Sequence, residues 1–230
     1  MSEAVTPGAP PAATLLAAGL GRRLGGVPKS ALRIGGQSLF ERLVQALREA
    51  GIDDIRAVVG PYADVLLPLA RRCGVRVVAQ PQSDAPLVAS QRLALHDHLR
   101  QPPGRDLMLL VADLPLLASE YLVPVVRAWA QRPAHVQAQV PVVQGVRGHP
   151  VLLSWAAVQA VAAQPWPRGV REWWLGAGDA VQALHTGHEA HTTDLDTPDD
   201  LAALRQRLHP LPVTWPDGLV QPGRVDQVLA

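Results

Sequence analysis

The first half of the chain alternates short apolar runs with segments whose apolar residues recur at helical spacing. Residues 107–111 (LMLLV) are apolar at every position, which is typical of a strand buried inside a parallel sheet. Residues 38–50 instead carry apolar side chains every three or four positions, and Gly51 follows where helices commonly end. This pattern predicts strands at 14–17, 55–59, 75–79 and 107–111, and helices at 38–50, 62–73 and 86–99. Repeated strand–helix units of this kind form parallel βαβ crossovers.

The second half is less regular. The pattern predicts helices at 121–130, 155–163, 171–175, 180–184 and 198–208, strands at 136–143 and 190–195, and a loop at 145–150. Thr197 and Pro198 suit the N-cap and the first position of the last helix. Prolines become frequent at both ends of the chain. We therefore expect a disordered segment at 1–12, one domain at 13–209 and a proline-rich tail at 210–230.

Composition narrows the classes of protein. The 230 residues fit one α/β domain, and a hydrophobic content of 48% supplies a sizeable core. The formal net charge of +1 argues against a basic face for nucleic acid. Cys73 is the single cysteine, which excludes an intramolecular disulfide and a cysteine-rich zinc site. No apolar run approaches the roughly 18 residues that span a bilayer, so we expect a cytoplasmic protein that does not contact membranes.

The most informative stretch is residues 16–29 (LAAGLGRRLGGVPK), which directly follows the first predicted strand. Glycines such as Gly19 and Gly21 let main-chain N–H groups approach phosphate oxygens. Arg23 and Lys29, the only lysine in the chain, add positive charge for a polyphosphate. The glycine spacing matches neither a P-loop nor a dinucleotide fingerprint.

Asp113 follows the apolar strand 107–111 in the sequence VADLP. Ligands of parallel α/β sheets bind beyond the carboxyl ends of the strands, where the glycine loop also lies. A carboxylate at this place can hold Mg²⁺, which typically takes one or two carboxylates together with substrate phosphates.

Four motifs together resemble the MobA/MocA-like nucleotidyltransferases. The loop LAAG-x-G-x-R-x-G-x-x-P-K is similar to the signature loop of that family, with Leu24 where the family usually has Met. The D-x-P at 113–115, the segment RGHPV at 147–151 and the segment DLDTPDDL at 194–201 resemble the family's later motifs, in the same order. The resemblance covers roughly residues 13–208.

The resemblance implies a single-domain α/β fold, a doubly wound and mostly parallel sheet of the nucleotide-diphospho-sugar transferase type. It also implies transfer of a nucleotidyl group from a nucleoside triphosphate to a phosphorylated acceptor, with release of pyrophosphate and with Mg²⁺ as cofactor. The nucleotide site would comprise Ala17, Ala18, Gly19, Gly21, Arg23, Lys29, Gln80 and Ser90; the acceptor side Gly148, His149 and Pro150; and the metal site Asp113 with Asp194 or Asp196. Arg23, Lys29 and Asp113 would carry catalysis.

Asp194 and Asp196 share one face if their segment is a strand, and the sequence does not choose between them. Asp199 and Asp200 instead suit the first turn of the following helix, where Asp200 can complete a capping box with Thr197.

Within the family the loop and the RGHPV segment favour the MocA-like branch. There the nucleotide is CTP and the acceptor is the molybdopterin cofactor, with a molybdoenzyme or its chaperone as a protein partner. Three alternatives stay open: a MobA-like guanylyltransferase that uses GTP, a sugar-phosphate nucleotidyltransferase, and a non-catalytic nucleotide-binding accessory protein. Residues 80–95 lack the glycine that the family usually has near the base, and 165–167 (PWP) replace its usual Gly-Asp pair.

His185, His188 and His191 recur at a spacing of three. A helical metal-binding pair would need a spacing of four, and Gly187 interrupts a helix here. We interpret this segment as a polar loop.

Overall fold

A computed structural model describes residues 9–101 and 104–219, and its centre is one eight-stranded sheet. The strands are β1 (Ala12–Ala17), β4 (Ile55–Val59), β5 (Arg76–Ala79), β6 (Leu107–Val111), β7 (Ala138–Val143), β8 (Val146–Arg147), β9 (Val151–Leu153) and β10 (Val181–His185). Seven of them follow the order β10-β7-β9-β6-β1-β4-β5, and β8 pairs with β7. The neighbours of β1 run parallel to it, so the predicted mostly parallel α/β sheet is confirmed.

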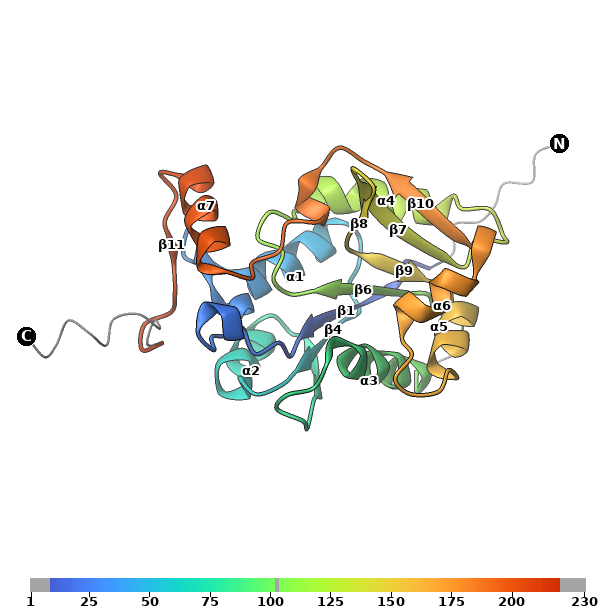
Figure 1. Cartoon of the computed structure of the whole chain (residues 1–230), viewed down its shortest axis with the longest axis horizontal. Coiled ribbons are helices and arrows are strands. Elements are labelled where there is room, and N and C mark those ends of the chain that lie inside the picture. Colours follow the sequence, from blue (N-terminus) through green and yellow to red (C-terminus); the bar gives the residue numbers. More distant parts are fainter. Residues whose placement is uncertain (1–8, 102–103, 220–230) are drawn as a thin grey trace, which may run out of the picture.

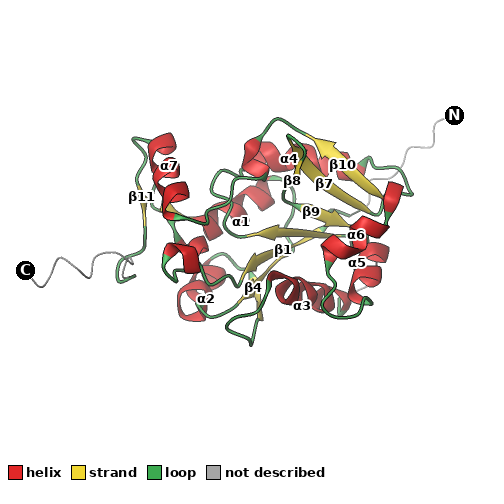
Figure 2. Cartoon of the chain, in the orientation of Figure 1, coloured by secondary structure: helices red, strands yellow, loops and turns green. Residues whose placement is uncertain are grey.

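Helices cover both faces of this sheet (Figure 1). They are α1 (Leu39–Glu49), α2 (Ala63–Arg72), α3 (Leu87–Leu99), α4 (Ser119–Ala130), α5 (Trp155–Ala162) and α6 (Val170–Gly176), whereas α7 (Pro198–Leu208) lies outside this sheet. Successive side chains of β1 point to opposite faces: Leu15 belongs to the core cluster that includes residues of α1, α2 and α4, whereas Leu16 belongs to the cluster that includes residues of α3, α5 and α6. The result is a three-layer, doubly wound domain (Figure 2).

Three sequence expectations about the second half were wrong. Residues 180–184 were expected to form a helix, but Val181–His185 is strand β10 because all five residues pair in parallel with β7. Residues 190–195 were expected to form a strand, but the chain makes a 3-10 helix at Glu189–His191. The residues that follow form no strand ladder with any described segment and make single hydrogen bonds to other loops, such as the bond from the Leu195 amide to the Asp113 carbonyl. The strands β8 and β9 were missed: β8 lies inside the expected loop 145–150 and pairs with β7, and β9 directly follows that loop and runs antiparallel between β6 and β7.

A small second sheet lies beside the main one. It joins β2 (Arg33–Ile34), β3 (Gln37–Ser38) and β11 (Val213–Thr214) in the order β11-β2-β3. Its core also includes Leu24 and Val27 of the glycine loop and Leu204 of α7. The C-terminal helix and strand therefore support the glycine loop from outside.

Helix α7 begins with the capping box that the sequence predicts. The Asp200 amide donates to the Thr197 hydroxyl (3.2 Å), and the Asp200 carboxylate accepts from the Thr197 amide (2.7 Å). Asp200 also accepts from the Asp196 amide at 3.0 Å. The start of α7 thus fixes the backbone that carries Asp196.

The predicted disorder at 1–12 and the predicted tail at 210–230 lie partly outside the described residues. Where they are described, Ala12 already belongs to β1, and Val213–Thr214 pairs with β2. None of the helices within 9–101 and 104–219 is long and apolar enough to cross a membrane.

Candidate active site

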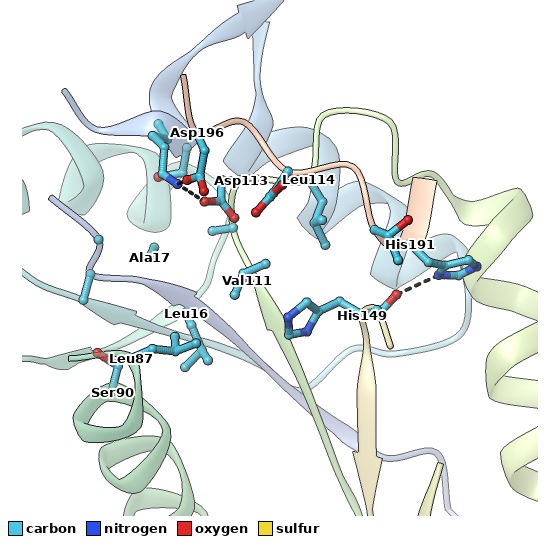
Figure 3. A pocket seen from close by; sticks show the side chains of 18 of the residues that line it. Leu16, Ala17, Leu87, Ser90, Val111, Asp113, Leu114, His149, His191 and Asp196 are labelled. Atoms are coloured by element: carbon cyan, nitrogen blue, oxygen red, sulfur yellow. Dashed lines mark hydrogen bonds and ion pairs between the residues drawn. The ribbon is translucent and has the colours of Figure 1, made fainter. Parts of the chain in front are cut away.

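A cavity of about 660 Å³ opens at the carboxyl ends of β1 and β6 (Figure 3). Its walls come from five segments distant in sequence: the glycine loop, the start of α3, the end of β6, and the two segments around 146–149 and 191–196. This is the edge where parallel α/β sheets bind their ligands.

The glycine loop turns sharply after β1. Gly21 has a φ of 58°, and a side chain there would collide with the Val27 carbonyl oxygen, so only glycine fits. The Tyr62 hydroxyl donates to the Leu20 carbonyl at 2.8 Å and holds the loop from the side of α2. Gly19, in contrast, faces open space in the cavity wall, where main-chain groups can approach a ligand.

Lys29 lies at the centre of the charged groups. Its ammonium contacts an oxygen of Asp113 and lies 2.7 Å from Asp196 Oδ1. Asp196 Oδ2 in turn accepts from Arg23 at 2.5 Å. Burial alone would lower the pKa of Lys29, but the charges and hydrogen bonds of Asp113 and Asp196 outweigh it and raise this pKa, so Lys29 stays cationic.

Two carboxylates retain capacity for a further cation. Asp113 Oδ1 is buried and has no hydrogen-bond partner among the described residues. Asp194 lines the same cavity, and partial burial, followed by the negative charges of Asp196 and Asp113, raises its pKa. Both observations indicate a place where added positive charge is favourable.

The α3 side of the cavity is less polar. Leu16, Ala85, Leu87 and Ser90 line it. Ser90 is buried, and its hydroxyl lies 3.5 Å from the amide nitrogen of Gln80. This side offers one hydroxyl and an apolar floor.

The opposite side is formed by residues 146–149. The His149 ring points into the cavity, and its Nδ1 is buried without a hydrogen-bond partner in the described structure (Figure 3). Burial lowers the pKa of His149, although the charge of Asp113 opposes this effect, so the imidazole is neutral near pH 7. A neutral imidazole can accept or donate a hydrogen bond to a ligand.

Residues 13–183 match the MobA-like NTP transferase domain. The chain belongs to this family. The match covers well over half of the chain and includes the glycine loop, Asp113 and residues 146–149, but it ends before Asp194 and Asp196. In this MobA-like protein those two carboxylates therefore come from the segment that follows the matched domain.

Individual proteins are similar to this chain in sequence or in fold. The bifunctional IPC transferase and DIPP synthase of Rubrobacter xylanophilus is 29% identical over 219 residues, which cover 82% of this chain and 50% of that protein. The structure of Rv0371c from Mycobacterium tuberculosis H37Rv superposes with a TM-score of 0.71 at 24% identity, over 85% of this chain and 98% of the other. The inositol-1-phosphate CTP transferase from T. maritima gives 0.60 at 16% identity, over 88% and 96%. The chain spans about a quarter to a half of the length of the curated relatives it matches.

Most of the residues predicted from sequence meet at this MobA-like cavity. Its walls include Ala17, Ala18, Gly19, Arg23, Lys29, Ser90, Asp113, Gly148, His149, Asp194 and Asp196. Three predicted residues do not line it. Gly21 lines a smaller adjoining cavity and shapes the loop, Gln80 is buried next to Ser90, and Pro150, which follows His149, is buried.

Sequence reasoning missed other cavity residues, of which Arg147 and His191 matter most. Arg147 precedes the predicted acceptor residues, and its guanidinium lies 4.9 Å from the centre of the Trp174 ring. The RGHPV motif contains this arginine, so a signal for it existed. His191 was interpreted as part of a polar loop, but it is buried and lines the cavity.

The three regularly spaced histidines do not assemble around a metal. Among the residues that the structure describes, no group of three or more His, Cys, Asp or Glu side chains is arranged to hold a metal ion. His188 packs on Tyr121 with ring centres 4.9 Å apart, whereas His191 donates to a main-chain carbonyl.

Proposed function

We propose that this protein transfers a cytidylyl group from CTP to the phosphate of the molybdopterin cofactor and releases pyrophosphate. One observation carries the proposal. Lys29, Arg23 and the partly unpartnered Asp113 gather at the middle of one cavity, between a wall containing Ser90 and a wall containing His149. A transferase needs this arrangement, because two substrates must meet where charge is neutralised.

The chemistry requires no protein nucleophile. A phosphate oxygen of the acceptor attacks the α-phosphorus of the nucleotide, and the bond from that phosphorus to the bridging oxygen of the β-phosphate breaks, so pyrophosphate carries away the electron pair. Gly19 and the loop amides are placed to cradle the triphosphate. Lys29 and Arg23 are placed to neutralise the charge on the leaving pyrophosphate.

The carboxylates fit a divalent cation. Asp113 has a buried, unpartnered oxygen, and the pKa of Asp194 is raised by partial burial and then by the negative charges of Asp196 and Asp113, which a cation would offset. Both oxygens of Asp196 already contact Lys29 or Arg23, so we assign the metal to Asp113 and Asp194. Asp196 would instead orient the side chains of Lys29 and Arg23. Mg²⁺ bound there would withdraw electron density from the reacting phosphate. The structural relative Rv0371c has been solved in complex with manganese.

The choice of CTP rests on the sequence of the loop and on a structural relative. Ala17-Ala18 and Pro28 resemble the MocA-like branch, and the T. maritima relative is named for CTP. The acceptor rests on the RGHPV resemblance, supported by the neutral His149 and by Arg147, which pairs with no carboxylate in the described part of the chain. An acceptor with a phosphate and further polar groups suits these side chains.

The test supplies CTP, GTP, UTP or ATP to the purified protein, with and without Mg²⁺ and with and without molybdopterin cofactor, and measures pyrophosphate. We expect release with CTP only, and only when metal and acceptor are both present. Release with GTP alone would make the protein a guanylyltransferase. Binding of a nucleotide without release for any acceptor, including sugar phosphates, would favour a non-catalytic accessory protein.

A further inference from the structure

The loop that carries His149 and the segment that carries Asp194 are joined by two reciprocal hydrogen bonds. The His149 amide donates to the His191 carbonyl at 2.8 Å, and His191 Nδ1 donates to the His149 carbonyl at 2.7 Å (Figure 3). The two residues are 42 positions apart in sequence. The main chain and the side chain of His191 therefore join the two segments that form these walls of the cavity.

Gly148 makes this approach possible. A side chain at this position would collide with the His191 carbonyl oxygen and would lie 2.8 Å from its carbon. On the other side, the Gly148 amide donates to the Pro141 carbonyl at the middle of β7 at 2.8 Å. The loop is thus held between the sheet and the segment around His191.

His191 is suited to this role by its burial. Only 2% of the residue is exposed, and its ring packs edge-on against Tyr121. Because a carbonyl oxygen can only accept, Nδ1 must carry the proton. Burial lowers the pKa of His191, with the neighbouring His188 adding to this effect and the bond to His149 opposing it, so the neutral Nδ1–H form makes the contact.

The same segment reaches the metal carboxylates three residues later. The Leu195 amide donates to the Asp113 carbonyl at 3.0 Å, so the run from His191 to Leu195 is fixed at both ends. Asp194 lies within this run. A displacement of the loop 146–149 would therefore move the carboxylate of Asp194 as well.

We propose that His191 is a positioning residue that fixes the acceptor loop, residues 146–149, relative to Asp113 and Asp194. The acceptor phosphate is then held in line with the α-phosphorus of the nucleotide. This inference rests on the proposed function. In this role His191 donates a hydrogen bond to the His149 carbonyl and neither binds a metal nor transfers a proton. Asparagine can reproduce this bond, because the amide nitrogen of Asn occupies nearly the place of Nδ1, whereas the longer Gln cannot.

The experiment compares His191→Phe, His191→Asn and His191→Gln in the full chain. With CTP and molybdopterin cofactor, we expect His191→Phe and His191→Gln to raise the KM for the acceptor about tenfold, the scale of one lost hydrogen bond, with little change in the KM for CTP. His191→Asn should restore the acceptor KM to within about threefold. His188→Phe, in the same segment but exposed, is the matched control and should behave like the wild type.

A second measurement does not depend on activity. Amide hydrogen exchange of residues 144–151 should speed up in His191→Phe and return to the wild-type rate in His191→Asn. If the wild type transfers no nucleotide but exchange responds in this way, the role of His191 in holding the loop is confirmed and the proposed function is wrong. Equal effects of Asn and Gln on exchange, or a parallel rise of both KM values, would overturn the role of His191.

Discussion

The ammonium of Lys29 lies 2.7 Å from Oδ1 of Asp196, a residue 167 positions further along the chain. The same ammonium contacts Asp113 at the end of β6. One cation thus joins the glycine loop, the central strand and the segment that precedes α7. The charged centre is complete only when the chain beyond the matched family domain is in place.

Lys29 is the only lysine, so amine-modifying reagents report on this contact directly. Its side chain is 14% exposed and its pKa is raised, so we expect it to react slowly with acetic anhydride near neutral pH. Asp196→Asn should speed the modification several-fold, because it removes one of the two carboxylates that raise the pKa of Lys29 and so increases the fraction of free amine. Mass spectrometry of the peptide that contains Lys29 separates it from the N-terminal amine.

The matched control for this experiment is Asp199→Asn. Asp199 is an exposed carboxylate three residues further on and should leave the rate of modification unchanged. If Lys29 reacts at one rate in the wild type, in Asp196→Asn and in Asp199→Asn, the ion pair does not protect it and our interpretation of the centre is wrong.

The strands and helices of the first half of the chain could be predicted from the sequence because their pattern is regular. The apolar run at 107–111 and the helical spacing at 38–50 each encode their structure locally, and the rule that ligands bind at strand carboxyl ends brought Asp113 to the glycine loop. The capping box of Thr197 and Asp200 is also local, since its partners are three residues apart.

What the sequence did not predict depends on distant partners. Residues 181–185 (VQALH) favour a helix by composition, and only the ladder with β7 makes them a strand. The three residues of β9 are too few to show a period. The roles of Asp196 and His191 follow from bonds across 167 and 42 positions, which no spacing rule encodes.

Removing either charge from the centre should stop catalysis. We expect Lys29→Ala and Asp113→Ala to lower kcat at least about 100-fold, the scale of losing one group that stabilises developing charge. Steady-state pyrophosphate release with CTP, Mg²⁺ and acceptor measures this. Arg100→Ala, an exposed cation on the far end of α3, is the control. Near-normal turnover in both alanine variants would contradict the assignment of this cavity as the active site.

Asp194 should reveal a conflict between stability and metal binding. Partial burial and the charges of Asp196 and Asp113 raise its pKa, so the folded protein holds this proton more tightly than the unfolded chain does. Its contribution to stability is therefore present at acid pH and is lost as the pH rises through the pKa of the folded state. Asp194→Asn should raise the metal-free Tm slightly near pH 7, because solvent screens much of the charge of this exposed residue, and this gain should shrink towards pH 4.

The same variant should lose the response to metal. In the presence of CTP, Mg²⁺ should raise the Tm of the wild type, because a ligand that binds only the folded state stabilises it. Asp194→Asn should show a much smaller Mg²⁺-dependent shift, whereas Asp199→Asn should keep the full one. A full shift in Asp194→Asn would transfer the metal role to Asp196 beside Asp113. Differential scanning fluorimetry over a series of pH values measures both effects.

Arg147 should set the affinity for the acceptor without affecting the nucleotide. Its guanidinium stacks on Trp174 and makes no ion pair in the described residues, whereas Arg22 pairs with Asp84 and Arg23 with Asp196. A cation held in place but unneutralised at a cavity wall is available to an anionic or polar group of the substrate.

We therefore expect Arg147→Ala to raise the KM for the acceptor about tenfold, the loss expected for a charge-assisted hydrogen bond, with the KM for CTP changed by less than about twofold. Arg147→Lys should recover part of the affinity, because it restores the charge but not the planar fork that stacks on Trp174. Arg171→Ala, an exposed arginine of α6 that does not line the cavity, should leave both constants unchanged. A rise in the KM for CTP instead would place the nucleotide on the wall that contains His149 and would exchange the two substrate sites.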